Sequence, residues 1–516
     1  MIRANNKRIA NNTVYLYLRM LITMAVSLYT VRVVFNVLTA QDYGLYSAVG
    51  GIILTFTFIS SVLDNASQRF FSFELGRGLE GHLRETFSTI IIIYVLVSIV
   101  VVIIAETIGI WFVNNKMIIP TGRESAATWV FQFALASFIV TITATPYRAM
   151  IIAQERMNLY AYISIFDAIS KLLIAYLLMV FAVDKLKLYA VLLFFFNLIS
   201  NFIYFIYCYN KYHEVHFKWH FDKTMFKSIF SYSSWTLFGT LSSMCNTQGV
   251  NIVLNMFFGP VANAAYSIAS QVYHTVGTFG SNFYVAVKPQ MIKSYASNNY
   301  GYVLKLFTFS SKTLFALICV IAIPLMVYST EILGLWLGSI GDYMVSFVKL
   351  SLIYVTILTV SYPITAIVQA TGQVKLYHSL VDGFSLISLP IIYFLFRLGF
   401  AAHWAYIISI LVFSIAHSLR IFVMKKVFPV FDIRKYVAEL IVPMTFIFVV
   451  GYSISRYCKV FIPDHFVSTI MGLFFTILLV LALCFIILYN KSEREMVWEL
   501  IKSWGIKGKN VQQQNN

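Results

Sequence analysis

The chain has 516 residues, of which 59% are hydrophobic and only 11% are charged, and its mean hydropathy is +0.79. A soluble domain of this size could not bury so much apolar surface, so the composition excludes soluble enzymes and indicates a polytopic membrane protein. The net charge of +17 does not indicate nucleic-acid binding, because Lys and Arg lie mostly in short loops between apolar runs.

The N-terminal stretch MIRANNKRIANNT is basic and polar, and the apolar run after it is too long for a signal peptide, so we expect no cleaved leader. The five cysteines are scattered without paired spacing. We therefore expect no disulfide framework, no metal site and no cofactor.

In chain order, apolar runs of about 20 residues predict an all-α protein with about 14 transmembrane helices. Their approximate ranges are 13–39, 43–68, 86–113, 126–147, 159–183, 187–209, 228–256, 261–287, 304–330, 343–369, 376–396, 401–424, 436–455 and 466–489.

The distribution of basic residues predicts the orientation of these helices. With a cytoplasmic N-terminus, the loops on that side hold 26 Lys and Arg and the opposite loops hold 7. In this count Arg148 and Arg420 belong to cytoplasmic loops, at 148–156 and 420–435. The positive-inside rule then places both termini in the cytoplasm, and we expect a multi-pass membrane protein. The outer loops are too short for a catalytic domain, so no enzyme is expected.

The chain also repeats itself. Residues 146–160, PYRAMIIAQERMNLY, align with 363–377, PITAIVQATGQVKLY, and the same offset of 217 pairs Tyr189 with Tyr406. An earlier segment repeats at an offset of 219, pairing Arg32 with Asn251 and Asn36 with Asn255, and one inserted residue then pairs Tyr46 with Tyr266. Two parallel six-helix bundles follow from this pattern, an arrangement found in transporters whose substrate path lies between the halves.

The repeat divides the chain into five expected parts. They are an N-terminal six-helix lobe at 1–212, a cytoplasmic linker at 213–227, a C-terminal six-helix lobe at 228–426, two further helices at 427–490 and a cytoplasmic amphipathic tail at 491–516. In the tail, Trp and aliphatic residues alternate with basic ones, which is typical of a helix lying on a membrane surface.

Several segments resemble a known family. Arg32 followed by Asp42-Tyr43-Gly44 and Tyr46, the stretch FFGPVANAAYSIASQV at 257–272 and IVQATGQVKLY at 367–377 resemble Wzx-type polysaccharide repeat-unit flippases. These belong to the MOP (multidrug/oligosaccharidyl-lipid/polysaccharide) superfamily, with a MATE-like fold. The resemblance implies transport of an undecaprenyl-diphosphate-linked oligosaccharide, for O-antigen (lipopolysaccharide) or capsule, from the inner to the outer leaflet by alternating access. The family motif often has Leu or Gly where this chain has Asn36.

A diphosphate on such a substrate calls for cations in a water-filled path. The candidates are Arg19, Arg32, Arg69, Lys171 and Lys312. For Arg19 and Arg32, snorkelling to the headgroups is an alternative. Arg69 could instead anchor the topology, and Lys171, one helical turn from Asp167, could form a structural bridge with it.

Sugar hydroxyls need neutral donors and acceptors, and the candidates for them are Asn36, Thr247, Gln248, Asn251 and Asn255. Such residues also join helices to one another. The candidates for proton or sodium coupling are Asp64, Asp167, His274 and Asp382. A packed, hydrogen-bonded histidine is the alternative for His274.

Together with these observations, the resemblance implies a flippase of the bacterial inner membrane. Its partners would be the lipid-linked oligosaccharide, membrane lipid and a polysaccharide polymerase, with a proton or sodium ion as the coupling ion, and the protein would be a monomer. The alternatives are an exporter of a peptidoglycan lipid precursor or of a cationic drug, and a membrane-embedded polysaccharide polymerase.

Overall fold

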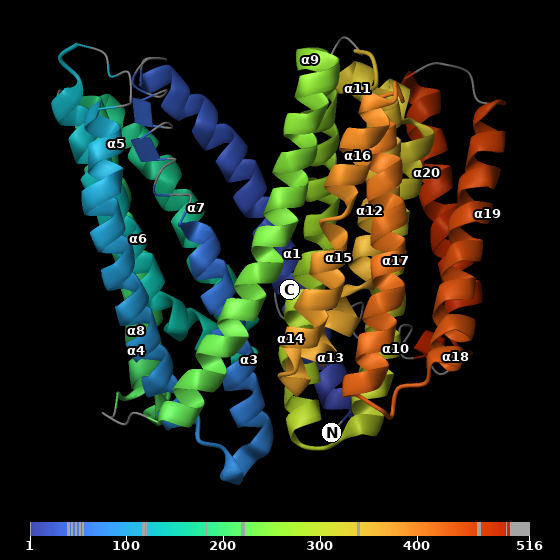
Figure 1. Ribbon diagram of the computed structural model, residues 1–516, viewed down its shortest axis with the longest axis horizontal. Helices are drawn as coiled ribbons and strands as arrows, with labels where there is room; N and C mark the ends of the chain where they lie inside the picture. The colour runs from blue at the N-terminus through green and yellow to red at the C-terminus, as the bar shows by residue number, and fades with distance from the viewer. Residues whose placement is uncertain are drawn as a thin grey trace, which may run out of the picture. The chain divides into compact units, whose positions relative to one another are not determined.

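The computed structural model contains helices and no strands among the residues that it describes (Figure 1). These residues are 2–38, 42, 45–46, 49–50, 53, 56–115, 119, 121–181, 183–217, 222–337, 341–461, 466–491 and 493–495. By contacts, the chain divides into two compact units. We call Ile9–Thr240 the N-unit, and Leu241–Asn516 together with Met1–Arg8 the C-unit.

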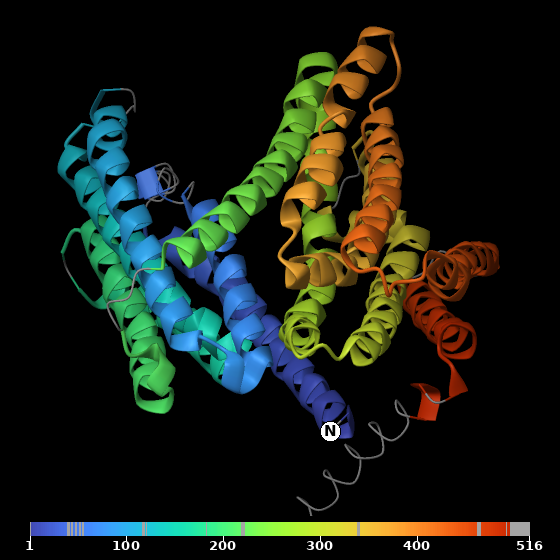
Figure 2. The ribbon, with the colours of Figure 1, turned by 60° about the horizontal axis from the view of Figure 1, so that its bottom comes forward.

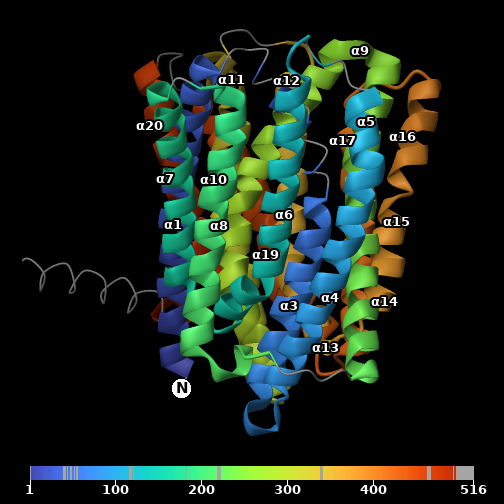
Figure 3. The ribbon, with the colours of Figure 1, turned by 90° about the vertical axis from the view of Figure 1, so that its left-hand side faces the viewer.

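The N-unit contains long helices joined by short connections. Its elements are α1 (Ile2–Val37), α3 (Thr57–Arg77), η1 (Gly78–Glu80), α4 (Leu83–Ile104), η2 (Ala105–Gly109), α5 (Ile110–Asn115), α6 (Glu124–Ala153), α7 (Met157–Val180), α8 (Lys185–Lys211), η3 (His213–Val215) and the start of α9 (Lys223–Ala296). Helix α6 packs against α3 and α8 (Figure 3). Small residues such as Ala149 and Ala153 are fully buried on α6, which lets neighbouring helices approach closely.

The C-unit continues from α9 with the remaining helices. They are α10 (Tyr300–Val327), α11 (Ser329–Leu337), α12 (Met344–Val360), α13 (Tyr362–Thr371), α14 (Val374–Tyr377), η4 (His378–Asp382), α15 (Gly383–Ser385), α16 (Ser388–Arg397), α17 (Trp404–Val427), α18 (Ile433–Tyr436), η5 (Val437–Ile441), α19 (Val442–Lys459), α20 (Phe466–Leu483) and η6 (Cys484–Leu488). Helix α10 is central, because it packs against α12, α19 and α20.

Ten helical segments of the described residues are long and apolar enough to cross a membrane. Of the other four predicted spans, 13–39 lies on α1, and 228–256 and 261–287 lie on the two arms of α9. The span 43–68 overlaps α3 from Thr57 onward, and much of its first part lies outside the described residues. Large apolar side chains face outward on the spans, including Ile103 on α4 and Phe474 on α20, as contact with lipid requires. The predicted all-α polytopic fold is confirmed.

Helix α9 is broken at Gly259, where the predicted spans 228–256 and 261–287 meet (Figure 2). Gly259 has φ 68° and ψ −165°, a conformation almost restricted to glycine. The next residue is Pro260, whose ring disfavours helical geometry in the residue before it. The Gly-Pro dipeptide therefore ends one helical arm and starts the next without a longer loop.

Candidate functional site

The N-unit contains a cavity of about 400 Å³ among α6, α7, α8 and the segment before α3, which we call the N-unit cavity. Two polar pairs line it. Lys171 Nζ donates to Asp167 Oδ2 at 2.8 Å on α7, and Asn197 Nδ2 of α8 donates to Thr141 Oγ1 of α6 at 3.2 Å. The cavity therefore offers one neutralised ion pair and one amide–hydroxyl pair within a largely apolar wall.

The C-unit contains a smaller cavity of about 230 Å³, the C-unit cavity, with a more polar wall. Four tyrosines, Tyr266, Tyr273, Tyr354 and Tyr406, line it together with polar and charged side chains from α9, η4, α15 and α17. The polar and charged members are Ser243, Asn246, Thr247, Ser270, His274, Asp382, Ser385, Ser409 and Arg420. A wall of this kind suits a hydrated or hydroxylated ligand.

The two cavities occupy equivalent places in the internal repeat. Tyr46 and its counterpart Tyr266 line one cavity each. The ring of Tyr46 lies 4.9 Å from that of Tyr189, and the ring of Tyr266 lies 5.3 Å from that of Tyr406. Two tyrosines at repeat-related positions are thus in ring contact in each unit.

An ion pair joins α3 to α6 within the N-unit. Arg148 Nη2 donates to Asp64 Oδ2 at 3.2 Å, and both side chains are largely buried. Arg69, further along α3, is 7% exposed, and its guanidinium carbon lies 4.5 Å from the Phe70 ring centroid. It also lies 5.7 Å from the ring of Tyr232. Aromatic faces attract cations, so these rings help to hold a guanidinium group inside the unit.

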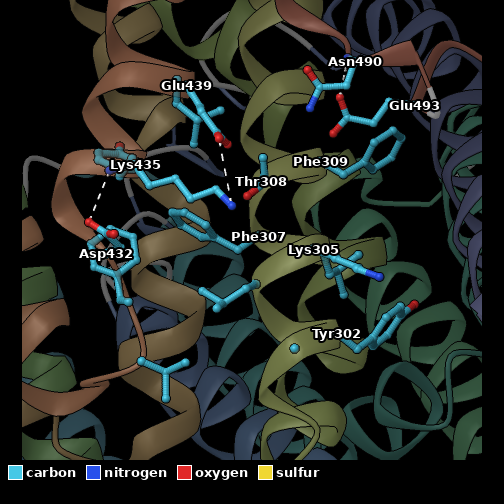
Figure 4. Close-up of a pocket in the computed structure, with 17 residues that line it drawn as sticks. Tyr302, Lys305, Phe307, Thr308, Phe309, Asp432, Lys435, Glu439, Asn490 and Glu493 are labelled. Carbon is cyan, nitrogen blue, oxygen red and sulfur yellow. Dashed lines mark hydrogen bonds and ion pairs between the residues drawn. The ribbon is translucent and has the colours of Figure 1, made fainter.

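A groove of about 720 Å³ lies on the C-unit between α10, α18, η5 and the segment that follows η6 (Figure 4). Lys435 is near Glu439 on one side, at 3.9 Å, while Glu493 lies beside Asn490 on the other. Lys312 on α10 is buried and donates from Nζ to Glu493 Oε2 at 2.7 Å. The segment that follows η6 thus supplies the counter-ion of a lysine in the middle of α10.

A family model described as "Polysaccharide biosynthesis protein" matches residues 9–295, which is more than half of the chain. The chain belongs to this family. No curated protein sequence matches the chain. The resemblance seen in the sequence motifs is therefore confirmed for the family.

Solved structures of MATE transporters share the fold of this family member. An outward-facing multidrug resistance MATE transporter of the MOP superfamily has a TM-score of 0.67 and 11% identity, covering 80% of this chain and 94% of that one. A MOP superfamily transporter from Pyrococcus furiosus has a TM-score of 0.66 and 10% sequence identity, and the match covers 81% of this chain and 96% of that one. The MATE transporter ClbM in complex with Rb+ has a TM-score of 0.64 and 15% sequence identity, and the match covers 80% of this chain and 94% of that one. These similarities show that the chain has the fold of MATE transporters, as the sequence motifs led us to expect.

The predicted anion-binding residues of this family member lie in different surroundings. The Arg19 guanidinium lies 4.8 Å from the ring of Tyr160 in the N-unit, and Arg69 is enclosed by aromatic rings. Lys171 faces the N-unit cavity, whereas Lys312 is bound to Glu493. Among the described side chains of the N-unit, these residues have different partners, and in the C-unit the bonded Lys312 is poorly available for a ligand.

The predicted glycan-binding residues on α9 also separate. Thr247 lines the C-unit cavity and Gln248 is exposed, while the Oδ1 atom of Asn251 is buried and accepts no hydrogen bond from the described residues. The side chains of Arg32, Asn36 and Asn255 lie outside the described residues, as does most of the predicted tail 491–516.

The four ion-coupling candidates all lie near polar or basic groups. Asp64 is bound to Arg148, and Asp167 is bound to Lys171. In the C-unit cavity, His274 is exposed, and Asp382 Oδ2 lies 2.6 Å from His378 Nδ1.

Three residues of these sites were missed by sequence reasoning. Arg148 and Arg420 were counted with the cytoplasmic loops, although the predicted span 401–424 contained Arg420. They lie inside α6 and α17, where Arg420 is 5% exposed. The loop assignment was wrong because the helices continue past the last strongly apolar residues. His378 was not predicted, although its i,i+4 spacing from Asp382 was a detectable signal.

Proposed function

We propose that this family member flips a polyprenyl-diphosphate-linked oligosaccharide across the bacterial inner membrane by alternating access. The family description places the chain in polysaccharide biosynthesis, and its fold is that of MATE transporters. Because such lipid carriers are made on the cytoplasmic side, polysaccharide assembly outside the cell requires a protein that moves them across.

The pairing of acidic groups with basic side chains is the observation that favours an anionic substrate over a cationic one. Each predicted acidic group has a basic side chain within reach in its own unit: Arg148 for Asp64, Lys171 for Asp167 and His378 for Asp382. A cationic drug would have to compete with these built-in partners. Buried arginines, in contrast, supply the donors that phosphate groups prefer.

The site residues follow from this proposal. Arg69, with Arg19 and Arg32, would take the diphosphate, and the amides of α9 and of the N-unit cavity would take the sugars. The side chains of Asp64, Asp167, His274 and Asp382 remain candidates for coupling to a proton or sodium ion. Both termini would face the cytoplasm, and a polysaccharide polymerase would take up the lipid-linked oligosaccharide at the outer leaflet.

Flipping can be tested in proteoliposomes. The purified protein is reconstituted with a fluorescent polyprenyl-diphosphate oligosaccharide, and dithionite reports the label that reaches the accessible leaflet. We expect protein-dependent movement that Arg69→Gln reduces, whereas Arg77→Gln, on an exposed residue of the same helix, should leave it unchanged. Movement of a lipid-linked disaccharide pentapeptide alone would favour the peptidoglycan precursor.

Drug export and polymerisation are tested by two separate experiments. If the reconstituted protein exports an organic cation such as ethidium and moves no lipid carrier, the proposed function is wrong. If gene deletion leaves repeat units on the outer leaflet but unpolymerised, a polymerase function replaces it.

A further inference from the structure

Arg420 is the most unusual charged group in the C-unit. It lies inside α17, is 5% exposed and lines the C-unit cavity. Its Nε donates to the hydroxyl of Tyr377 at 3.0 Å, and its guanidinium carbon lies 4.2 Å from the centroid of the Phe413 ring. These contacts are to neutral groups.

The guanidinium group of Arg420 lacks a counter-ion among the described residues. Its Nη1 atom is buried without a hydrogen-bond partner, and no described carboxylate lies within ion-pair distance of the group. Guanidinium stays protonated in proteins, so the group cannot avoid this cost by becoming neutral. A buried charge without a partner is strongly unfavourable, which indicates that an anion belongs beside it.

The other titratable groups around the cavity do not supply that anion. Asp382 lines the same cavity, but its carboxylate lies 2.6 Å from His378 Nδ1. His417, on the same helix as Arg420, is hydrogen-bonded through one ring nitrogen to Ser361 Oγ and through the other to the hydroxyl of Tyr436. His274 is a neutral or cationic group and cannot balance an arginine.

We propose that the C-unit cavity binds one small monovalent inorganic anion, such as chloride, with Arg420 as its anchor. The hydroxyls of Tyr354 and Ser409 line the same cavity and can complete the coordination. A volume of about 230 Å³ holds a hydrated halide with room to spare. The wall offers one permanent cation and also Asp382, which repels polyanions, so a monovalent ion fits better than a diphosphate.

This anion site does not depend on which substrate is transported. The anion would neutralise a buried charge in the C-unit, and its binding can be measured without any lipid carrier.

The test measures ³⁶Cl⁻ binding to the full-length protein in nanodiscs, equilibrated in gluconate buffer. We expect saturable binding of one ion per chain. Arg420→Gln should weaken binding by about tenfold or more, because a charged hydrogen bond is lost. Arg397→Gln, which changes an exposed arginine of the same unit, should bind as the wild type does. Absence of saturable binding, or equal affinity in Arg420→Gln, would overturn the proposal.

Two further measurements separate folding and ligand identity from the anion claim. If Arg420→Gln does not fold, Tyr354→Phe removes only a hydroxyl from the cavity wall and should still weaken chloride binding severalfold; unchanged affinity would count against the site. Inorganic pyrophosphate should compete poorly with ³⁶Cl⁻. If it displaces the label at lower concentration than unlabelled chloride, the cavity is a diphosphate site and the inorganic-anion proposal is wrong.

Discussion

The buried ion pair between α10 and the C-terminal segment gives a quantitative stability prediction. The Lys312 side chain is 2% exposed and its Nζ lies 2.7 Å from Glu493 Oε2. Glu493→Gln removes the charge and leaves a buried ammonium group facing a neutral amide. Removing one partner of a buried ion pair costs about 3–5 kcal/mol. The apparent melting temperature in detergent, followed by intrinsic fluorescence, should therefore fall by on the order of 10 °C.

The reverse deletion should be milder. Lys312→Met fills the same space with an apolar chain, and the remaining Glu493 is 18% exposed and still accepts the backbone N–H of Asn490 at 2.8 Å. The double variant should then be no less stable than Lys312→Met, with a coupling energy above about 1 kcal/mol. Lys305→Met, on the exposed side of α10, is the matched control and should change little. Strictly additive losses in the double variant would refute the argument.

Three further predictions follow from other contacts. Gly259→Ala should destabilise the protein by about 1–3 kcal/mol, because its backbone conformation is nearly restricted to glycine. Gly301→Ala, at a helical position where a Cβ meets open space, should not destabilise it. Equal melting temperatures of the two variants would contradict this prediction. Asp167→Asn and Lys171→Gln should each lower the free energy of unfolding by less than about 1 kcal/mol, because the ion pair is partly exposed. Both should reduce flipping in proteoliposomes, and full activity would show that these residues are not part of the site. Arg123→Gln should cost about 1–3 kcal/mol, since this side chain bonds two separate aspartates in the N-unit, and an unchanged denaturation midpoint would show that neither bond matters.

Features that depend on residues close together in the chain could be predicted. The apolar runs predicted the helical membrane fold, and the interval between the predicted spans 228–256 and 261–287 contains the break in α9. The i,i+4 spacing of Asp167 and Lys171 predicted a pair, which the structure contains. Helical geometry brings such residues together whatever the rest of the chain does.

Contacts between helices could not be predicted in the same way. Asp64 was predicted only as an ion-coupling candidate, but its carboxylate accepts a hydrogen bond from Arg148, 84 residues away. Lys312 likewise finds its partner 181 residues away, in a segment that was expected to be a surface tail. Such pairs depend on which helix faces meet, and hydropathy gives no information about that.

The distance along the chain between Lys312 and Glu493 has a consequence for biosynthesis. The lysine enters the membrane with α10, but its carboxylate partner is made 181 residues later. At about 5–20 residues per second, the ammonium group waits roughly 10–40 seconds before it can be neutralised. During that interval the insertion machinery or the membrane surface must shelter it from lipid. A chain that ends before residue 493 therefore carries the Lys312 ammonium group without its counter-ion.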